Sequence, residues 1–177
     1  MNKKIRWITE TAVMLALLVA LQAITKPLGQ IVTGSFVNVV LAITVLVAGL
    51  YSGITVALIS PICAFLLGIA PKPIVVLPIM VGNACYVVLL ALIIGKTMKP
   101  VWKQPVAVAT AATVKFGVMY LLIVLACKVF SGVMWNGAPF APPAIIATFE
   151  WRQLVAALIG GSVALLIVPV LRKALHK

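Results

Sequence analysis

The sequence predicts an all-α polytopic membrane protein, in which a single domain covering residues 1–177 forms a bundle of six transmembrane helices. The composition is 64% hydrophobic and only 9% charged, and the mean hydropathy is +1.27. The apolar residues fall into runs of about 18–25 residues, which is the length that a helix needs to cross a hydrocarbon core of roughly 30 Å. Basic residues gather in short clusters between these runs, as topology signals do.

The apolar runs give the expected spans in chain order. The second and third spans are joined by almost nothing, residues 51–53. Pro61 and Pro78 lie inside the third and fourth runs, where each is expected to bend its helix. Residues 130–150, rich in glycine and proline, are expected to form the one long loop. The approximate spans are residues 7–25, 34–51, 53–70, 74–95, 105–129 and 153–171.

The basic clusters indicate the orientation. They precede the first span, separate the fourth and fifth, and follow the sixth; their members are Lys3, Lys4, Arg6, Lys96, Lys99, Lys103, Arg172, Lys173 and Lys177. With six spans, all three clusters share one side, which the positive-inside rule makes cytoplasmic, together with both termini. Because the net charge of +12 comes mostly from these separate clusters, we expect a lipid bilayer and no nucleic acid as a partner.

A stripe of small residues marks the first span. The stretch AVMLALLVALQ, residues 12–22, places Ala12, Ala16 and Ala20 on one helix face, because residues four apart lie on the same side. A face of small residues lets another helix approach closely, which is how helices associate inside membranes. The residues alone leave two interpretations open, packing within this bundle and docking on another protein.

A second group of charges lies away from the cytoplasmic clusters. Lys26 ends the first span on the outer side, and Lys72 lies in the outer loop APKP. Lys128 lies near the outer end of the fifth span, and Glu150 and Arg152 flank the outer start of the sixth. Each of these residues alone is more often an interfacial residue than one that binds a ligand.

Lys115 differs from these interfacial charges. It stands about ten residues into the fifth span, roughly 15 Å deep. A charge at that depth should face a polar interior and a partner. Asn83 lies at a comparable depth in the fourth span, beside Gly82, although an interhelical hydrogen bond would equally explain an asparagine there. Lys115 and Asn83 together predict a polar pocket that opens to the outside.

Residues of the types that act in catalysis or bind metals are scarce, so we expect no enzymatic activity, no metal and no other cofactor. The single histidine, His176, lies in the C-terminal tail, and the three cysteines lack the paired spacing of metal sites. Glu10 and Glu150, the two carboxylates, are expected near opposite faces of the membrane. Residues 95–97 (GKT) match the end of a phosphate-binding loop, but Leu90 stands where that motif needs glycine.

Three stretches resemble the S component, the substrate-binding membrane subunit, of an energy-coupling factor (ECF) transporter. They are AVMLALLVALQ, VTGSFVNVVLAITVLVAGLYSGITVALISPICAFLLGI and VLPIMVGN, and the resemblance covers nearly the whole chain. It implies a multi-pass protein of the prokaryotic plasma membrane that captures a water-soluble vitamin from outside. Delivery would require a transmembrane coupling subunit, on which Ala12, Ala16 and Ala20 would dock, and two ATPase subunits.

The resemblance also implies that the substrate is held by the loops after spans one, three and five. The basic residues around the pocket favour a carboxylate or phosphate, as in pantothenate, nicotinate, folate, lipoate or biotin. Trp135, Trp151, Phe140 and Tyr120 are candidates for stacking a ring, although interfacial aromatic residues more often anchor a helix. The expected substrate-binding residues are Lys26, Gln30, Asn38, Lys72, Asn83, Lys115, Trp135, Asn136, Glu150 and Arg152.

Two other classes of protein stay open. One is a stand-alone channel or facilitator for small solutes, whose copies would assemble through faces such as Gly49-x-x-x-Gly53. The other is a membrane assembly subunit without a ligand. A facilitator should move solute in vesicles without other subunits, whereas an assembly subunit should bind nothing small.

Overall fold

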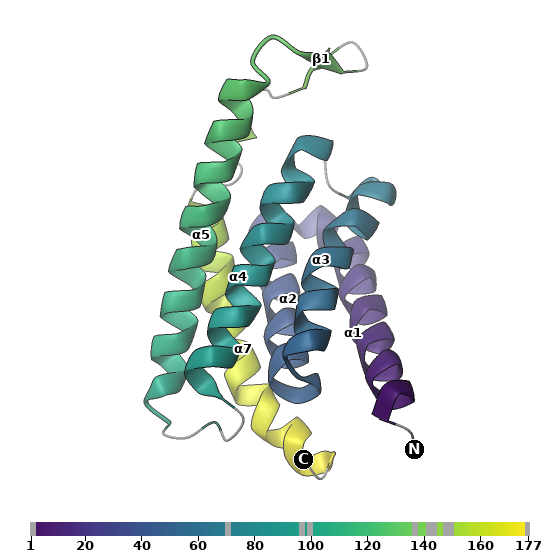
Figure 1. The fold of residues 1–177 in the computed structure, drawn as a ribbon, viewed down its shortest axis with the longest axis vertical. Coiled ribbons are helices and arrows are strands. Elements are labelled where there is room, and N and C mark those ends of the chain that lie inside the picture. The colour runs from purple at the N-terminus through teal and green to yellow at the C-terminus, as the bar shows by residue number, and fades with distance from the viewer. Residues whose placement is uncertain are drawn as a thin grey trace.

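A computed structural model of the chain describes residues 3–69, 72–95, 98, 101–135, 138–140, 145–146 and 151–175. In this part of the chain the helices run roughly along one axis (Figure 1). The long helices are α1 (Lys3–Thr25), α2 (Gln30–Ile43), α3 (Leu50–Leu66), α4 (Val76–Ile94), α5 (Lys103–Val129) and α7 (Trp151–Ala174). Shorter elements are η1 (Lys26–Leu28), η2 (Thr44–Ala48), η3 (Pro73–Val75) and a small hairpin of β1 (Met134–Trp135) and β2 (Ala138–Pro139).

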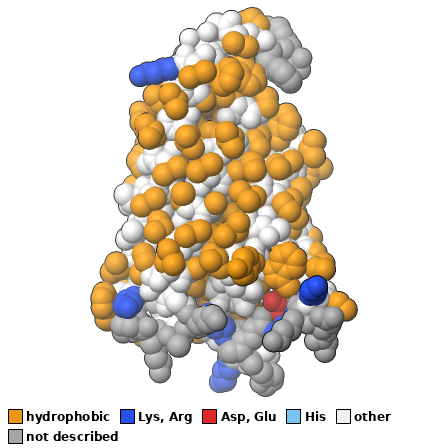
Figure 2. Space-filling view, in the orientation of Figure 1, with side chains coloured by type: hydrophobic (Ala, Val, Ile, Leu, Met, Phe, Trp, Pro, Cys, Tyr) orange, Lys and Arg blue, Asp and Glu red, His pale blue; other side chains and the backbone are white. Residues whose placement is uncertain are grey.

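The long helices are apolar on the outside as well as in the core. Leu92, Leu121 and Leu166, on α4, α5 and α7, are all largely exposed. Hydrophobic side chains cover the middle of the visible face, and lysine and arginine lie towards its two ends (Figure 2). Such a surface suits lipid rather than water.

The sequence prediction of an all-helical bundle agrees with this architecture. Five described helical segments are long and apolar enough to cross a membrane: Lys4–Leu28, Gln30–Ala48, Pro73–Ile94, Lys103–Val129 and Trp151–Ala174. The remaining long helix, α3, is apolar but has 17 residues, or about 25 Å of helix. Both ends of the chain lie at the same end of the bundle (Figure 1).

The chain reverses between α2 and α3 at Gly49. The end of α2 continues into the π-helical turn η2, and Gly49 follows it with φ at 98°. Glycine adopts this left-handed backbone without strain. The predicted break at residues 51–53 was therefore wrong, since these residues already belong to α3.

Gly53 serves packing inside the chain. A Cβ atom built on it would lie 2.7 Å from Val87 Cγ1 and 2.9 Å from Val45 Cβ, so α3 touches its neighbours through the bare backbone. The pattern Gly49-x-x-x-Gly53 therefore does not form an outward face for oligomers. Its first glycine makes the turn and its second lies in the interior.

The two prolines singled out in the sequence fall in different places. Pro61 lies inside α3, as predicted. Pro78 lies in the first turn of α4, which begins at Val76. Amide groups of a first turn have no partner within the helix, so Pro78 removes no helical hydrogen bond and the predicted cause of a bend is absent there.

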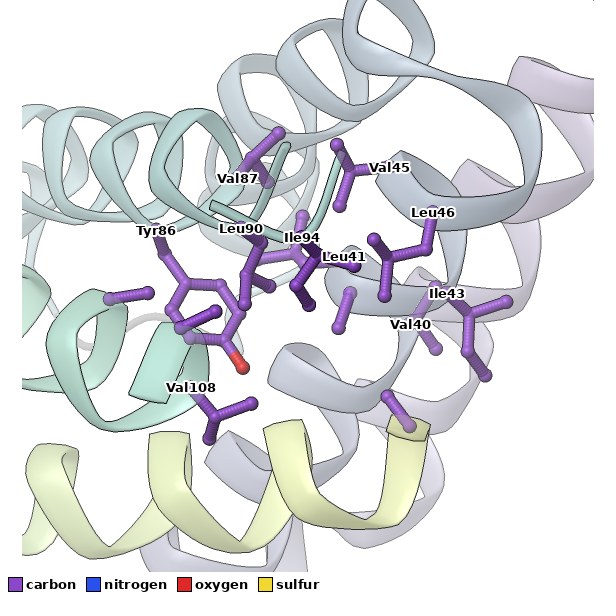
Figure 3. Packing of buried hydrophobic residues seen from close by; sticks show 14 of the residues in the cluster. Val40, Leu41, Ile43, Val45, Leu46, Tyr86, Val87, Leu90, Ile94 and Val108 are labelled. Carbon is purple, nitrogen blue, oxygen red and sulfur yellow. The ribbon is translucent and has the colours of Figure 1, made fainter. Parts of the chain in front are cut away.

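The main apolar core lies towards the end of the bundle that holds the termini. It is built from the later halves of α2, α4 and α7 and the first half of α5. Leu41, Val87 and Leu90 are fully buried there and pack together with Val108 (Figure 3). This half of the bundle is therefore filled with side chains, and a cavity lies in the other half.

Candidate functional site

A partly open cavity of about 260 Å³ lies in the half of the bundle away from the termini. Its walls come from the late turns of α1 and α3, the early turns of α2, α4 and α7, and the middle of α5. Amide side chains dominate the polar part of the wall, together with two lysines. These residues are Gln22, Gln30, Asn38, Asn83 and Gln153, with Lys26 and Lys115.

Lys115 is the most deeply buried charge of this cavity, with 2% of its surface exposed. Its Nζ atom donates hydrogen bonds to Oδ1 of Asn38 at 2.6 Å and to Oδ1 of Asn83 at 2.7 Å. The same nitrogen lies 5.4 Å from the centre of the Tyr86 ring. One ammonium therefore joins α2, α4 and α5, and its described partners are two amide oxygens and a ring face.

Two glycines make room for this group. A Cβ atom on Gly82 would overlap Met119 and lie 2.7 Å from its Sδ atom, so α5 approaches α4 closely beside Asn83. A Cβ atom on Gly160 of α7 would lie 2.6 Å from Cβ of Asn38. Because glycine has no side chain, α5 packs closely against α4, which carries Asn83, and α7 packs closely against α2, which carries Asn38.

The positive charge of Lys115 meets no carboxylate within the described residues. Glu10, the carboxylate that the structure describes, forms an ion pair of 2.9 Å with Arg6 near the start of α1. Hydrogen bonds from neutral amides satisfy the donors of a buried ammonium, but they do not neutralise its charge. Glu150, the other carboxylate of the sequence, lies outside the described residues.

Two side-chain atoms of the cavity wall are buried without a hydrogen-bond partner in the described part of the chain. They are Nδ2 of Asn83 and Oε1 of Gln22. Because an ammonium only donates, the amide oxygen of Asn83 must face Lys115, which leaves its Nδ2 donor for another group. Nδ2 of Asn38 has such a group, Gly34 O at 2.8 Å. Buried polar atoms are normally paired, so these two atoms are candidate hydrogen-bonding partners for an occupant of the cavity.

Lys26, an exposed lysine of the cavity wall, makes a hydrogen bond at the mouth of the cavity. Its Nζ atom donates a hydrogen bond of 2.6 Å to Gly68 O, in the turn after α3. The side chain is exposed, so this contact links the C-terminal ends of α1 and α3 without fixing a buried charge. Gln30, at the start of α2, lies on the same rim.

Five of the residues expected to bind substrate come together in the cavity wall. They are Lys26, Gln30, Asn38, Asn83 and Lys115. Lys72 and Arg152 are described and do not line it; Lys72 precedes η3, and Arg152 is exposed in the first turn of α7. Asn136, Glu150 and the side chain of Trp135 lie outside the described residues.

The aromatic candidates for stacking lie elsewhere. Tyr120 contacts Phe116, with 6.0 Å between ring centres, and Phe140 packs edge-on against Phe130 at 5.3 Å. Trp151 is more than half exposed. None of Tyr120, Phe140 and Trp151 lines the cavity, so the described residues supply no stacking partner from that group.

Sequence reasoning missed two amides of the wall, Gln22 and Gln153. A signal existed for Gln22, which lies four residues before Lys26 and therefore on the same helix face. Gln153 lies in the first turn of α7, where polar residues are common at a membrane surface, so nothing in its position distinguishes it. Tyr86, the ring beside Lys115, was not singled out either.

The stripe of Ala12, Ala16 and Ala20 lies on the exposed side of α1. The opposite side of the helix faces the bundle, where Leu18 is fully buried and Thr11 donates a hydrogen bond of 2.9 Å to Ser52 Oγ. Among the described residues, the stripe is therefore not a packing face. It is open to lipid or to another protein.

No family model, no curated protein and no solved structure matches the chain. The site is therefore interpreted from its own chemistry. Within the described residues, no three side chains of the His, Cys, Asp and Glu types gather as metal ligands do. The cavity combines a buried cation, an unpaired amide donor and an unpaired amide acceptor, which equips it to bind a polar solute.

Proposed function

We propose that this protein is the substrate-binding subunit of an ECF-type importer in a prokaryotic plasma membrane. It captures a small, anionic, vitamin-like compound from outside and delivers it through a separate ATP-driven coupling module. The observation that carries the proposal is the buried ammonium of Lys115, bonded to two neutral amides in the wall of a cavity. A desolvated cation without a described counter-ion favours an anionic occupant.

The expected topology supports an outward-facing cavity. Both chain ends lie at the end of the bundle opposite the cavity (Figure 1). The basic clusters near those ends support a cytoplasmic location for them by the positive-inside rule. With six crossings, α3 included, the mouth beside Lys26 would then face the outside of the cell.

The apolar core argues for a binding subunit over a channel. Below the cavity, Leu41, Val87 and Leu90 are fully buried in a packed cluster (Figure 3). A channel needs a polar path to the opposite side, whereas a subunit that only binds its cargo needs one mouth. Release to the cytoplasm would then require a partner.

The exposed alanine stripe supplies a surface for that partner. Ala12, Ala16 and Ala20 are all exposed on α1, and small side chains let a helix of another subunit come close. Together with the resemblance to S components, this favours docking on a transmembrane coupling subunit, which two ATPase subunits would drive.

The cavity volume narrows the expected cargo. Pockets for drug-sized ligands measure roughly 300–1,000 Å³, and this cavity measures about 260 Å³. Compact acids such as nicotinate, pantothenate, lipoate or biotin therefore suit it better than folate.

Binding and uptake by the lone protein test the proposal. The purified protein is first analysed by native mass spectrometry for a retained small acid, and its binding of radiolabelled nicotinate, pantothenate, lipoate and biotin is measured. We expect the protein alone, reconstituted in liposomes, to bind one such compound without accumulating it. Passive movement of solute would favour the facilitator, concentrative uptake without partners would contradict the proposal, and a protein that binds nothing small would be an assembly subunit.

A further inference from the structure

We infer that the cavity takes a small monocarboxylate that enters with its carboxylate first, so that Nζ of Lys115 and Nδ2 of Asn83 hold the two oxygens. This inference rests on the proposed function and specifies its substrate. It follows from three features of the cavity: the count of buried charges, the position of the free donors and the character of the wall.

The count of charges favours a single negative charge on the ligand. Lys115 is the buried cation of the cavity, and its described partners are neutral. The second lysine of the wall, Lys26, is exposed and donates to Gly68 O. A buried charge is stabilised best by one opposite charge with good hydrogen bonds. A phosphate monoester carries about 1.5–2 negative charges at pH 7 and has three strong acceptor oxygens, more than one buried ammonium can balance.

The free donors lie on neighbouring groups. An ammonium has three N–H donors, and Lys115 uses two of them on Asn38 and Asn83. Nδ2 of Asn83 has no partner in the described chain, although its residue is 1% exposed and lines the cavity. Because Oδ1 of the same amide touches Lys115, its Nδ2 donor lies close to the ammonium. Two adjacent donors of this kind suit the two oxygens of one carboxylate.

The rest of the cavity wall suits a ligand that has an apolar chain or ring and one further polar group. Ile79, Met119, Pro61 and Ala64 line the cavity and offer only hydrocarbon and a thioether. Oε1 of Gln22 is the unpaired acceptor of the same cavity. The expected ligand is therefore an acid whose carboxylate meets Lys115, with an apolar chain or ring and an N–H or O–H group that reaches Gln22.

Simple acids without any vitamin structure test the carboxylate site directly. The melting temperature of the full chain in detergent is measured with benzoate, with its neutral analogue benzamide and with inorganic phosphate. We expect benzoate at several times its Kd to raise the melting temperature by about 2–4 °C. Benzamide and phosphate should not raise it.

Four variants identify the groups involved. Lys115→Met removes the cation, and Asn83→Asp places a carboxylate where the ligand would bind while it keeps a partner for Lys115. Both should lose the benzoate shift. Lys128→Met changes an exposed lysine that does not line the cavity and should keep the shift. Glu150→Gln tests whether the carboxylate of Glu150 already neutralises Lys115.

The remaining outcomes separate this inference from the proposed function. Equal shifts with benzamide, or a benzoate shift that survives in Lys115→Met, would overturn the carboxylate site. So would a benzoate shift that occurs only in Glu150→Gln, because Lys115 would then already be neutralised by this chain. Absence of any benzoate shift counts against the inference too. If a neutral vitamin binds, each of these results removes the anionic cargo but leaves the role as an importer subunit. Concentrative uptake by the lone protein would remove the proposed function whatever benzoate does.

Discussion

Asn38 on α2 and Asn83 on α4 present their amide oxygens to the same nitrogen, Nζ of Lys115, at 2.6 and 2.7 Å. One side chain of α5 thereby ties three helices together, α2, α4 and α5 itself. The two amides replace hydrogen bonds that the ammonium would make to water, but they do not neutralise its charge. The stability of the empty protein and its affinity for an anion should therefore respond in opposite directions to changes at Lys115.

Replacing Lys115 by Met removes the charge and keeps the volume. In the empty protein, the variant no longer bears the desolvation cost of a buried charge, and this gain offsets the two lost hydrogen bonds. The amides of Asn38 and Asn83 can bind water in the cavity instead. We expect the melting temperature in detergent to hold or rise. Affinity for the cargo should fall by roughly 2–4 kcal/mol, the loss expected when a buried charge loses its partner. A variant that melts earlier yet binds normally would make Lys115 a structural residue.

Replacing Asn38 by Leu has the opposite effect on stability. It leaves the ammonium with one amide partner, so we expect the free energy of unfolding to fall by about 2–3 kcal/mol. Adding Lys115→Met to Asn38→Leu should recover most of this loss, because the unpaired charge is then gone. A double-mutant cycle of urea unfolding in mild detergent measures the coupling. Additive losses would show that the bond between the two residues contributes little.

The sequence predicts those parts of the fold and the site that stand out against an apolar background. Lys115 and Asn83 interrupt long hydrophobic runs, and the structure brings them within 2.7 Å of each other. Gly49 does not stand out in the same way, because the apolar run continues through it. Its turn depends on the left-handed backbone conformation of Gly49, which the hydropathy pattern does not show. The break between α2 and α3 was therefore misplaced.

Which charged residues at the helix ends line the cavity was harder to predict. Lys26, Lys72 and Arg152 all lie near the ends of helices, and hydropathy does not distinguish a residue that lines a cavity from one that faces the lipid surface. Only Lys26 of the three lines the cavity. The choice depends on helix rotation, which packing between helices sets and the pattern of one helix does not reveal.

Substitutions of glycine test the close packing around the site. A Cβ atom on Gly160 would lie 2.5 Å from the backbone oxygen of Ser35, which cannot move without shifting α2. We therefore expect Gly160→Ala to lower the free energy of unfolding by about 1–3 kcal/mol. The clash at Gly82 is with the flexible Met119, so Gly82→Ala should cost less.

Gly117 of α5 provides the matched control for the glycines. A Cβ atom there meets nothing within 4 Å, and alanine is the better helix former by about 1 kcal/mol. Gly117→Ala should be neutral or stabilising in thermal unfolding. Equal losses of stability in Gly117→Ala and Gly160→Ala would show that Gly160 does not act through close packing of the helices.

The alanine stripe is tested by uptake in the presence of a coupling module. Ala16 is exposed on α1 and lies outside the cavity wall, so Ala16→Trp should leave binding of the cargo within about twofold of the unchanged protein, a difference of roughly 0.4 kcal/mol. Uptake by the complete complex should be lost, because an indole ring prevents close approach of a partner helix. Leu121→Trp, a large residue on the exposed face of α5, is the control and should keep both activities. Uptake that survives Ala16→Trp would show that the stripe faces lipid, and equal loss of uptake in Leu121→Trp would show that bulk on any face is harmful.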